Sequence, residues 1–148
     1  MIVEGQIEVN APVQEVWDFL LDIQAFSSCM PGLEEIYQRD DETFDGVVSA
    51  KVGPISGKFH FTAGIVESMP PSEMKVRVDG HDDVTKSKID ATVSLTLNKD
   101  GDGTRLCHRI DVEIEGRLAI IGDMILRGVA GVMLKEFAKR LRSRLEKV

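Results

Sequence analysis

Three histidines are the residues of this sequence best suited to acid–base or metal chemistry, namely His60, His81 and His108. No two of them have the spacing of metal ligands on one helix, and the HExxH, GxSxG, GxGxxG and GxxxxGK(S/T) motifs are all absent. Cys29 and Cys107 stand far apart, with no CxxC motif and no Cys/His cluster. The sequence therefore predicts no catalytic residue, no metal site and no cofactor.

His108 differs from the other two histidines in its predicted surroundings. Strand alternation places it on the same face as Leu106 and Ile110, whereas His60 lies opposite Phe59 and is expected to face solvent. One interpretation of His108 is a hydrogen-bonded histidine of the core. The other is a polar group that points into a ligand cavity and orients a mainly apolar guest.

Acidic residues surround His81. Asp79, Asp82 and Asp83 lie close to it, near a predicted turn. Such a group can bind a metal ion, but charged residues at a turn more commonly form a solvated loop. We therefore expect an exposed acidic loop here.

The elements that position these residues follow from the hydropathy pattern. Alternation with a period of two dominates the first 116 residues and predicts strands, and a period of three to four residues then predicts a helix. The expected order is a strand within 1–10, a helix within 12–21, a short helix or turn at 23–28, strands near 33–38, 44–52, 59–65, 74–81, 89–97 and 106–114, and a long C-terminal helix after Gly116.

A single sheet of this size has one apolar face to hide, and one long helix can cover it. We expect one α+β domain over residues 1–148, in which a curved antiparallel sheet of about seven strands wraps around the C-terminal helix, with one or two short helices after the first strand. Such a fold tends to leave an elongated apolar cavity between sheet and helix. The residues predicted to line it are Trp17, Phe59, Phe61, Val93, Leu95, His108, Ile110, Met124, Gly128 and Gly131.

Small residues are dense in the first half of the predicted C-terminal helix, where Gly122, Gly128 and Gly131 lie. Glycine inside a helix costs about 1 kcal/mol relative to alanine. Its presence implies either close packing on the sheet or space kept open for a ligand. Met124 adds flexible apolar surface, which suits adaptable binding.

Charge is distributed unevenly along the chain. The net charge is −7, yet the segment from Arg117 onward holds eight Lys and Arg against three Asp and Glu. The acidic remainder argues against nucleic-acid binding, which needs a basic face. The basic helix end is either a docking surface for an acidic partner or anionic lipid, or a solvated face whose cations complement the helix dipole. Its candidate docking residues are Lys139, Arg140, Arg142 and Arg144.

The sequence predicts a cytoplasmic protein. Residues 1–10 alternate in hydropathy, unlike the basic start and continuous apolar stretch of a secretory signal. The most apolar segment, 118–134, is interrupted by Asp123 and Arg127 and falls short of the about 20 residues that span a bilayer. The chain ends at Val148 without an apolar anchor, so we expect at most peripheral contact with the inner membrane face.

Several segments, in this order and spacing, carry a resemblance that covers essentially the whole chain. IEVNAP at 7–12, VWDFL at 16–20 and CMPG at 29–32 resemble the START-like superfamily, which includes polyketide cyclases and lipid-transfer domains. Three further segments are similar to the CoxG family of carbon monoxide dehydrogenase accessory proteins, namely KVGPI at 51–55, GT at 103–104 and GRLA at 116–119 with Gly122.

The resemblance implies both a fold and a role. The superfamily implies a helix-grip fold, in agreement with the element order above. The CoxG family implies an accessory protein of molybdenum-containing dehydrogenases, proposed to help tether the enzyme to the membrane and to handle a quinone-like ligand.

Three functions remain open at this point. The first is non-catalytic binding of an apolar small molecule, quinone- or lipid-like, as an accessory to a carbon monoxide dehydrogenase-like redox enzyme. The second is a cyclase- or hydratase-type enzyme that uses polar groups of the cavity such as His108. The third is a protein-interaction module whose cavity is filled by its own side chains. The missing acid–base pairs favour the first and third.

Overall fold

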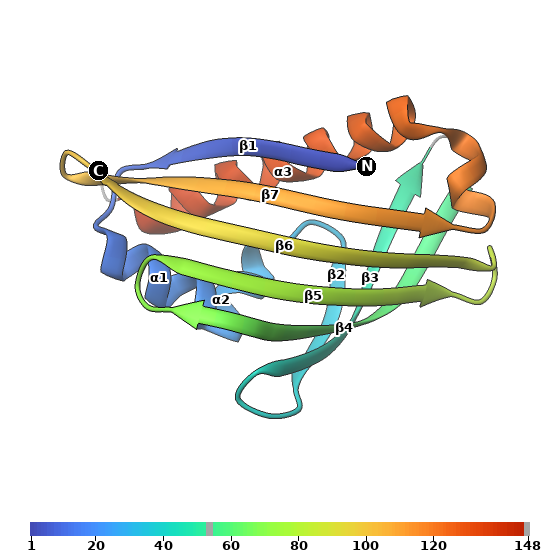
Figure 1. The fold of residues 1–148 in the computed structure, drawn as a ribbon, viewed down its shortest axis with the longest axis horizontal. Coiled ribbons are helices and arrows are strands. Elements are labelled where there is room, and N and C mark those ends of the chain that lie inside the picture. Colours follow the sequence, from blue (N-terminus) through green and yellow to red (C-terminus); the bar gives the residue numbers. More distant parts are fainter. Residues whose placement is uncertain (53–54, 147–148) are drawn as a thin grey trace.

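Seven antiparallel strands form one open, curved sheet in the order β1-β7-β6-β5-β4-β3-β2 (Figure 1). The computed structural model describes residues 1–52 and 55–146, so Gly53, Pro54, Lys147 and Val148 lie outside the described residues. The strands are β1 (Ile2–Val9), β2 (Leu33–Gln38), β3 (Thr43–Val52), β4 (Ile55–Met69), β5 (Glu73–Asp82), β6 (Ser87–Asp100) and β7 (Gly103–Glu115).

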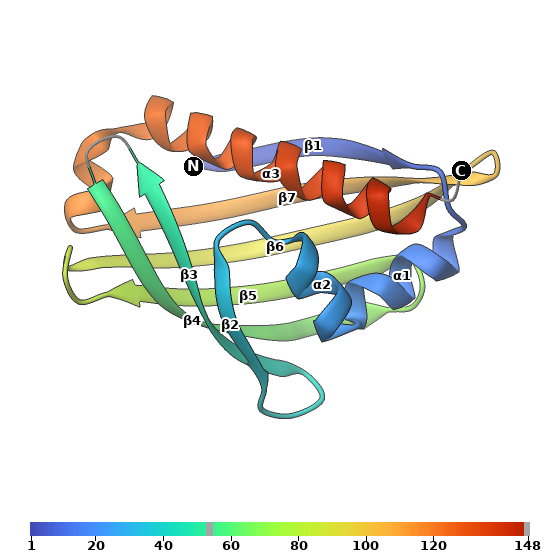
Figure 2. The same ribbon diagram turned by 180° about the vertical axis from the view of Figure 1, so that it is seen from behind.

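Helices occupy one side of the sheet. The short helices α1 (Val13–Leu21) and α2 (Ile23–Cys29) follow β1, and the Asp22 side chain caps α2 by accepting hydrogen bonds from two backbone N–H groups. A 3-10 turn, η1 (Arg117–Ile121), then leads into the long α3 (Asp123–Leu145). Figure 2 shows α3 lying along β1 and β7 on the concave side, with α1 and α2 at one end.

Side chains of α3 cover the free edge of β1. The guanidinium of Arg127 donates to the Ile2 carbonyl oxygen at 2.6 Å, and that of Arg142 donates to the Glu8 carbonyl oxygen at 2.8 Å. The Glu146 carboxylate accepts from the Asn10 N–H at 2.9 Å. The two arginine bonds satisfy backbone groups that an edge strand otherwise leaves unpaired, and the Glu146 bond fixes the chain just beyond the end of β1.

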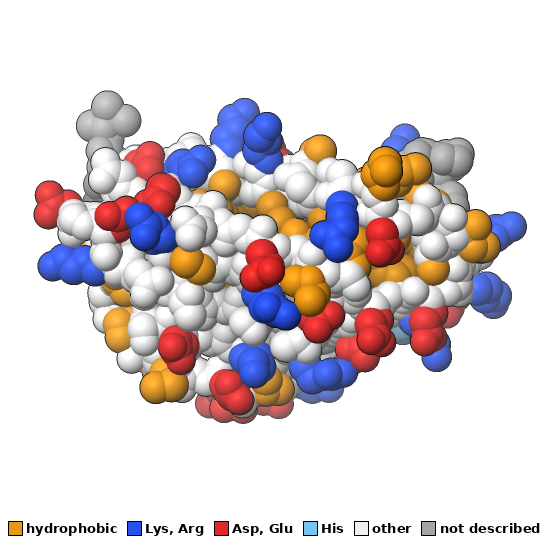
Figure 3. Space-filling view, turned by 45° about the horizontal axis from the view of Figure 1, so that its top comes forward, with side chains coloured by type: hydrophobic (Ala, Val, Ile, Leu, Met, Phe, Trp, Pro, Cys, Tyr) orange, Lys and Arg blue, Asp and Glu red, His pale blue; other side chains and the backbone are white. Residues whose placement is uncertain are grey.

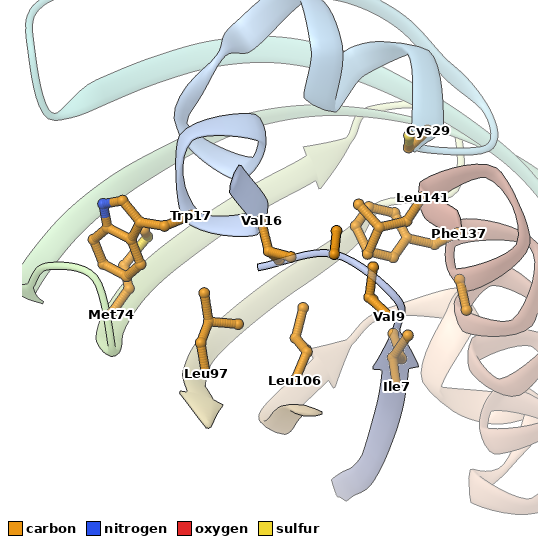
Figure 4. Packing of buried hydrophobic residues seen from close by; sticks show 12 residues of the cluster. Ile7, Val9, Val16, Trp17, Cys29, Met74, Leu97, Leu106, Phe137 and Leu141 are labelled. Atoms are coloured by element: carbon orange, nitrogen blue, oxygen red, sulfur yellow. The ribbon is translucent and has the colours of Figure 1, made fainter. Parts of the chain in front are cut away.

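Buried apolar side chains form two separate clusters. The first, which we call the large end cluster, joins α1, α2 and the second half of α3 to the sheet; Figure 4 shows Ile7, Val16, Trp17, Leu106, Phe137 and Leu141 within it. The second, the small end cluster, consists of Phe59, Leu118 and Leu126 with partly buried neighbours. The clusters hold α3 near both of its ends.

The fold expected from the sequence is therefore confirmed. A curved antiparallel sheet of seven strands holds a long C-terminal helix, and two short helices follow the first strand. The expected helix after Gly116 begins as the 3-10 turn η1 and becomes α-helical at Asp123. Within 1–52 and 55–146, none of the helices combines the length and apolarity needed to cross a bilayer.

Candidate functional site

The middle of the concave face is apolar but incompletely covered. Cross-strand register places Ile110 of β7 beside Val93 of β6, Val93 beside Val76 of β5, and Val76 beside Ile65 of β4. The next row pairs Val112 with Ala91 and Ala91 with Val78. We call the half-buried members of these rows the apolar floor, namely Ile65, Val76, Val78, Val93, Ile110 and Val112. Of these, Ile65 and Val76 pack against the large end cluster.

The part of α3 that faces this floor is also half-buried. Leu126 is buried in the small end cluster, and Phe137 and Leu141 are buried in the large one. Between them, the sheet-facing residues Ala130 and Met133 keep part of their surface accessible. We call these two facing, half-buried apolar surfaces, one on the sheet and one on α3, the trough.

His108 is the polar side chain at the edge of this floor. Only 9% of its surface is exposed, and its Nδ1 has no hydrogen-bond partner among the described residues. Burial lowers the pKa of the imidazole from its ordinary value, because the charged form loses its hydration. The burial of His108 agrees with the core interpretation made from the sequence, but Nδ1 lacks the hydrogen bond that this interpretation assumed.

Five of the ten predicted cavity residues lie on the concave face of the sheet, namely Phe61, Val93, Leu95, His108 and Ile110. Leu95 packs there against the large end cluster.

Two further predicted residues are buried within the end clusters instead. Trp17 is 4% exposed in the large end cluster, where Figure 4 shows its indole beside Met74, and Phe59 is 6% exposed in the small one. These two side chains therefore belong to the packed ends of the concave face.

The prediction was wrong for Met124, Gly128 and Gly131, which lie on the outer side of α3. Met124 is 87% exposed, and a Cβ built on either glycine would meet no atom within 4 Å. Residues advance by roughly 100° along a helix, so once Leu126 and Phe137 face the sheet these three positions must point away from it. They therefore do not line the trough.

The four basic residues predicted to form a docking surface point in different directions. Arg140 is half-buried and pairs with Glu136 at 3.0 Å, and Arg144 donates to the Ser28 hydroxyl oxygen on α2 at 3.0 Å. Arg142 bonds the edge of β1, as described above. Lys139 is exposed on the outer side of α3.

A recess with a volume of about 940 Å³ lies on the outer face of the sheet. It is lined by His60 and His81, which are cross-strand partners with ring centroids 5.7 Å apart, and by acidic residues such as Asp79 and Glu113. His60 is exposed, as predicted. Within 1–52 and 55–146, no three His, Cys, Asp or Glu side chains are placed to hold a metal ion.

The expected exposed acidic loop near His81 needs one correction. Asp82 is only 4% exposed, and its carboxylate accepts hydrogen bonds from the backbone N–H groups of Lys58 and Val84. Burial alone would raise its pKa, but these bonds outweigh that effect and lower it. Asp82 therefore organises the turn after β5.

Sequence reasoning overlooked several residues of the floor. Val76, Val78 and Val112 showed the right alternation, but alternation identifies a face of a strand without saying which part of that face stays uncovered. Cross-strand register and the position of α3 decide that.

The side where α3 runs beside β1 is also partly apolar, and Figure 3 shows hydrophobic side chains gathered there among charged ones.

Comparison with protein families identifies a relationship over nearly the whole chain. The family model for CoxG, a subunit of carbon monoxide dehydrogenase, matches residues 5–146. The chain belongs to this family. Membership of the CoxG family and a START-like fold together suggest a ligand-binding accessory protein.

Solved structures agree with this CoxG-family protein in fold. A conserved protein from Geobacillus kaustophilus has a TM-score of 0.90 at 23% identity, covering 98% of this chain and 95% of its own. A START superfamily protein from Mycobacterium smegmatis has a TM-score of 0.74 at 18% identity, covering 98% of this chain and 97% of its own.

A protein from Chromobacterium violaceum also has a TM-score of 0.74 at 18% identity, covering 99% of both chains. At these identities the likeness to solved structures shows the fold alone. No protein of curated function matches the CoxG-family chain.

Proposed function

We propose that this CoxG-family protein binds an apolar small molecule, quinone- or lipid-like, in the trough between α3 and the sheet. The observation that carries the proposal is the contrast along the concave face between two packed ends and an apolar middle that is only partly buried. Val93 and Ile110 pair there and remain half-buried although neither β6 nor β7 is an edge strand. Covering such surface with a ligand is favourable by about 25 cal/mol per Å² removed from water.

Non-catalytic binding is favoured over a cyclase- or hydratase-type reaction. General acid–base catalysis needs a titratable group whose pKa is tuned by its neighbours to the reaction. Burial alone displaces the pKa of His108, with no contribution from a nearby charge or hydrogen bond. A lone neutral imidazole among apolar side chains suits orientation of a ligand better than proton transfer.

The partner in this proposal is a molybdenum-containing, carbon monoxide dehydrogenase-like redox enzyme. Support comes from membership of the CoxG family, whose description links it to that enzyme. We further propose a cytoplasmic location with at most peripheral contact at the inner membrane face. The two free cysteines, Cys29 and Cys107, fit a reducing compartment.

Native mass spectrometry of gently purified protein, before and after extraction with organic solvent, tests the binding proposal. We expect an additional mass that extraction removes. The extracted protein should then bind the uncharged dye N-phenyl-naphthylamine saturably, with enhanced fluorescence. A folded, extracted protein that binds no apolar probe would overturn the proposal and favour an interaction module with a closed interior.

A further inference from the structure

The recess on the outer face of the sheet lies on the side turned away from α3. Its lining residues come from six neighbouring strands, β2 to β7, and its volume is about 940 Å³. Pockets that bind small molecules measure about 300–1,000 Å³. Eight Asp and Glu residues line the recess against two Lys. The recess is therefore large enough to hold part of a binding partner, and its charge is strongly negative.

Carboxylates face one another across the strands within this recess. Asp79 of β5 lies directly opposite Asp90 of β6, and Asp90 lies directly opposite Glu113 of β7. We call these three residues the carboxylate row. Arg77 pairs with Asp90 at 2.8 Å and lies 3.9 Å from Asp79, whereas Glu113 has no ion-pair partner among the described residues. Like charges directly opposite one another are destabilising, and one arginine offsets only part of that repulsion.

Opposite charges are paired elsewhere on the same face of the sheet. Glu8 of β1 lies opposite Arg105 of β7 with their charged groups 3.0 Å apart, and Glu4 lies opposite Arg109 at 3.8 Å. The unbalanced charge is thus a local feature of the recess. A local arrangement that opposes stability, in a sheet that otherwise avoids it, is typical of a functional site.

Aromatic side chains lie among the carboxylates of the recess. His60 and His81 are cross-strand partners with ring centroids 5.7 Å apart and an angle of 26° between the rings. Tyr37 of β2 is 62% exposed and donates its hydroxyl to the Glu35 carboxylate at 3.3 Å. Lys and Arg are attracted to aromatic faces as well as to carboxylates, and the planar guanidinium also stacks on rings. This combination suits cationic side chains, arginine above all.

We propose that the recess is a docking surface for an arginine- or lysine-rich segment of another protein. The inference goes beyond the proposed function, because the recess lies on the opposite face of the sheet from the trough and requires no ligand there.

The spread of the charges favours an extended partner. Neighbouring strands lie about 4.8 Å apart, so the carboxylate row is about 10 Å long and several cations of one segment can pair along it. In the described ranges 1–52 and 55–146, no three His, Cys, Asp or Glu side chains converge on a metal ion. A guanidinium can bind a carboxylate through two parallel hydrogen bonds, which makes arginine the favoured cation.

Fluorescence anisotropy of a rhodamine-labelled peptide, in which four arginines alternate with glycines, tests the proposal. The unaltered protein should bind this peptide saturably at about 0.1 M salt. Binding should be lost at about 1 M salt, where the screening length falls from about 10 Å to about 3 Å. The same peptide with glutamine in place of arginine should not bind.

Two double variants of equal net charge separate docking in the recess from general attraction to an acidic protein. Asp79→Asn with Glu113→Gln leaves Asp90 and its ion pair in place and should weaken peptide binding about tenfold. Glu15→Gln with Asp102→Asn, at exposed positions outside the recess, should weaken it less than about twofold. The recess variant should unfold at the same or a higher urea concentration, because repulsion within the carboxylate row is relieved.

The histidines report the position of the peptide on the unaltered protein. His60 and His81 line the recess, whereas His108 is buried on the concave face. The imidazole proton NMR signals of His60 and His81 should therefore move as the peptide is added, and those of His108 should stay in place.

Several results would overturn the proposal. Absence of saturable peptide binding, equal weakening in both double variants, or binding that leaves the His60 and His81 signals unmoved would each do so. Spermidine that binds as tightly as the peptide would make the recess a site for small cations and would exclude a protein segment as its occupant. None of these results depends on dye binding in the trough, so the two proposals fail separately.

Discussion

The imidazole of His108 lies against the backbone of Gly5, its cross-strand partner on β1. A Cβ on residue 5 would lie 2.9 Å from Nε2 of His108, which is closer than real Cβ atoms approach, and 3.0 Å from Cε1, which is tighter than most real contacts. Glycine at position 5 therefore makes room for the ring. The edge of the ring that carries Nε2 and Cε1 is thus held in place by its contact with β1.

Replacing Gly5 with alanine should displace the His108 ring. We expect a loss of about 1–3 kcal/mol in the free energy of unfolding, as for other overpacking substitutions. The same substitution in a His108→Ala background should cost less, because the clash is gone, and a double-mutant cycle of urea unfolding measures that coupling. Gly64→Ala is the control, because a Cβ at Gly64 would meet nothing within 4 Å. Equal costs in both backgrounds would disprove the contact.

Stability should depend on pH through His108. Burial lowers its pKa in the folded state, so the unfolded chain binds the proton more readily. The contribution of His108 to the free energy of unfolding is fully present above its pKa in the unfolded chain, about 6.5. It is lost as the pH falls from there through the pKa of His108 in the folded protein. The midpoint of urea unfolding should therefore decrease as the pH is lowered from about 7 to about 5. His108→Phe should flatten this slope, and an identical slope in that variant would assign it to other groups.

Filling the trough should block ligand binding without unfolding the protein. Val93→Phe or Ile110→Phe adds volume on the half-buried apolar floor, so each should lower the affinity for N-phenyl-naphthylamine about tenfold or more while the melting temperature holds. Gly128→Leu is the control on the outer side of α3. It should leave dye binding unchanged and raise stability by up to about 1 kcal/mol, because leucine is the better helix former. Unaltered dye binding in both Phe variants would place the dye elsewhere.

Phe137 should be essential for the attachment of α3 to the sheet. It is 9% exposed in the large end cluster, with its ring centroid 5.8 Å from that of Phe26. Phe137→Asp buries an unpaired carboxyl group at a cost of several kcal/mol, comparable to the total stability, so thermal unfolding should show little folded protein. Val132→Asp on the same helix, where the side chain is 70% exposed, should change the melting temperature little. A stable Phe137→Asp protein would mean that α3 does not depend on this cluster.

Arg142 and Lys139 should differ in their effect on stability although both lie on the basic end of α3. Arg142→Gln removes the bond to the Glu8 carbonyl oxygen and should cost about 1 kcal/mol. Lys139→Gln removes only an exposed charge and should be neutral within about 0.5 kcal/mol. Chemical unfolding of the two variants makes the comparison, and equal values would show that the bond contributes nothing to stability.

The sequence by itself determined the elements and their order. Alternation along strands such as β6 and β7 was unbroken over many residues, and the switch to a helical period after Gly116 marked the long C-terminal helix. Those patterns record local geometry, in which side chains alternate along a strand and recur every three to four residues along a helix. They were sufficient for the fold and for the concave position of His108.

Only the tertiary structure decided which of these residues form the site. Apolar residues occur around much of α3, because Met124 and Val132 lie on one side and Leu126 and Phe137 on the other, so hydropathy did not single out the sheet-facing side. That choice depends on the packing of α3 between two clusters built from distant segments. The contact between Gly5 and His108 depends likewise on the register of β1 against β7, which is set by long-range pairing and is not encoded in the alternation of either strand alone.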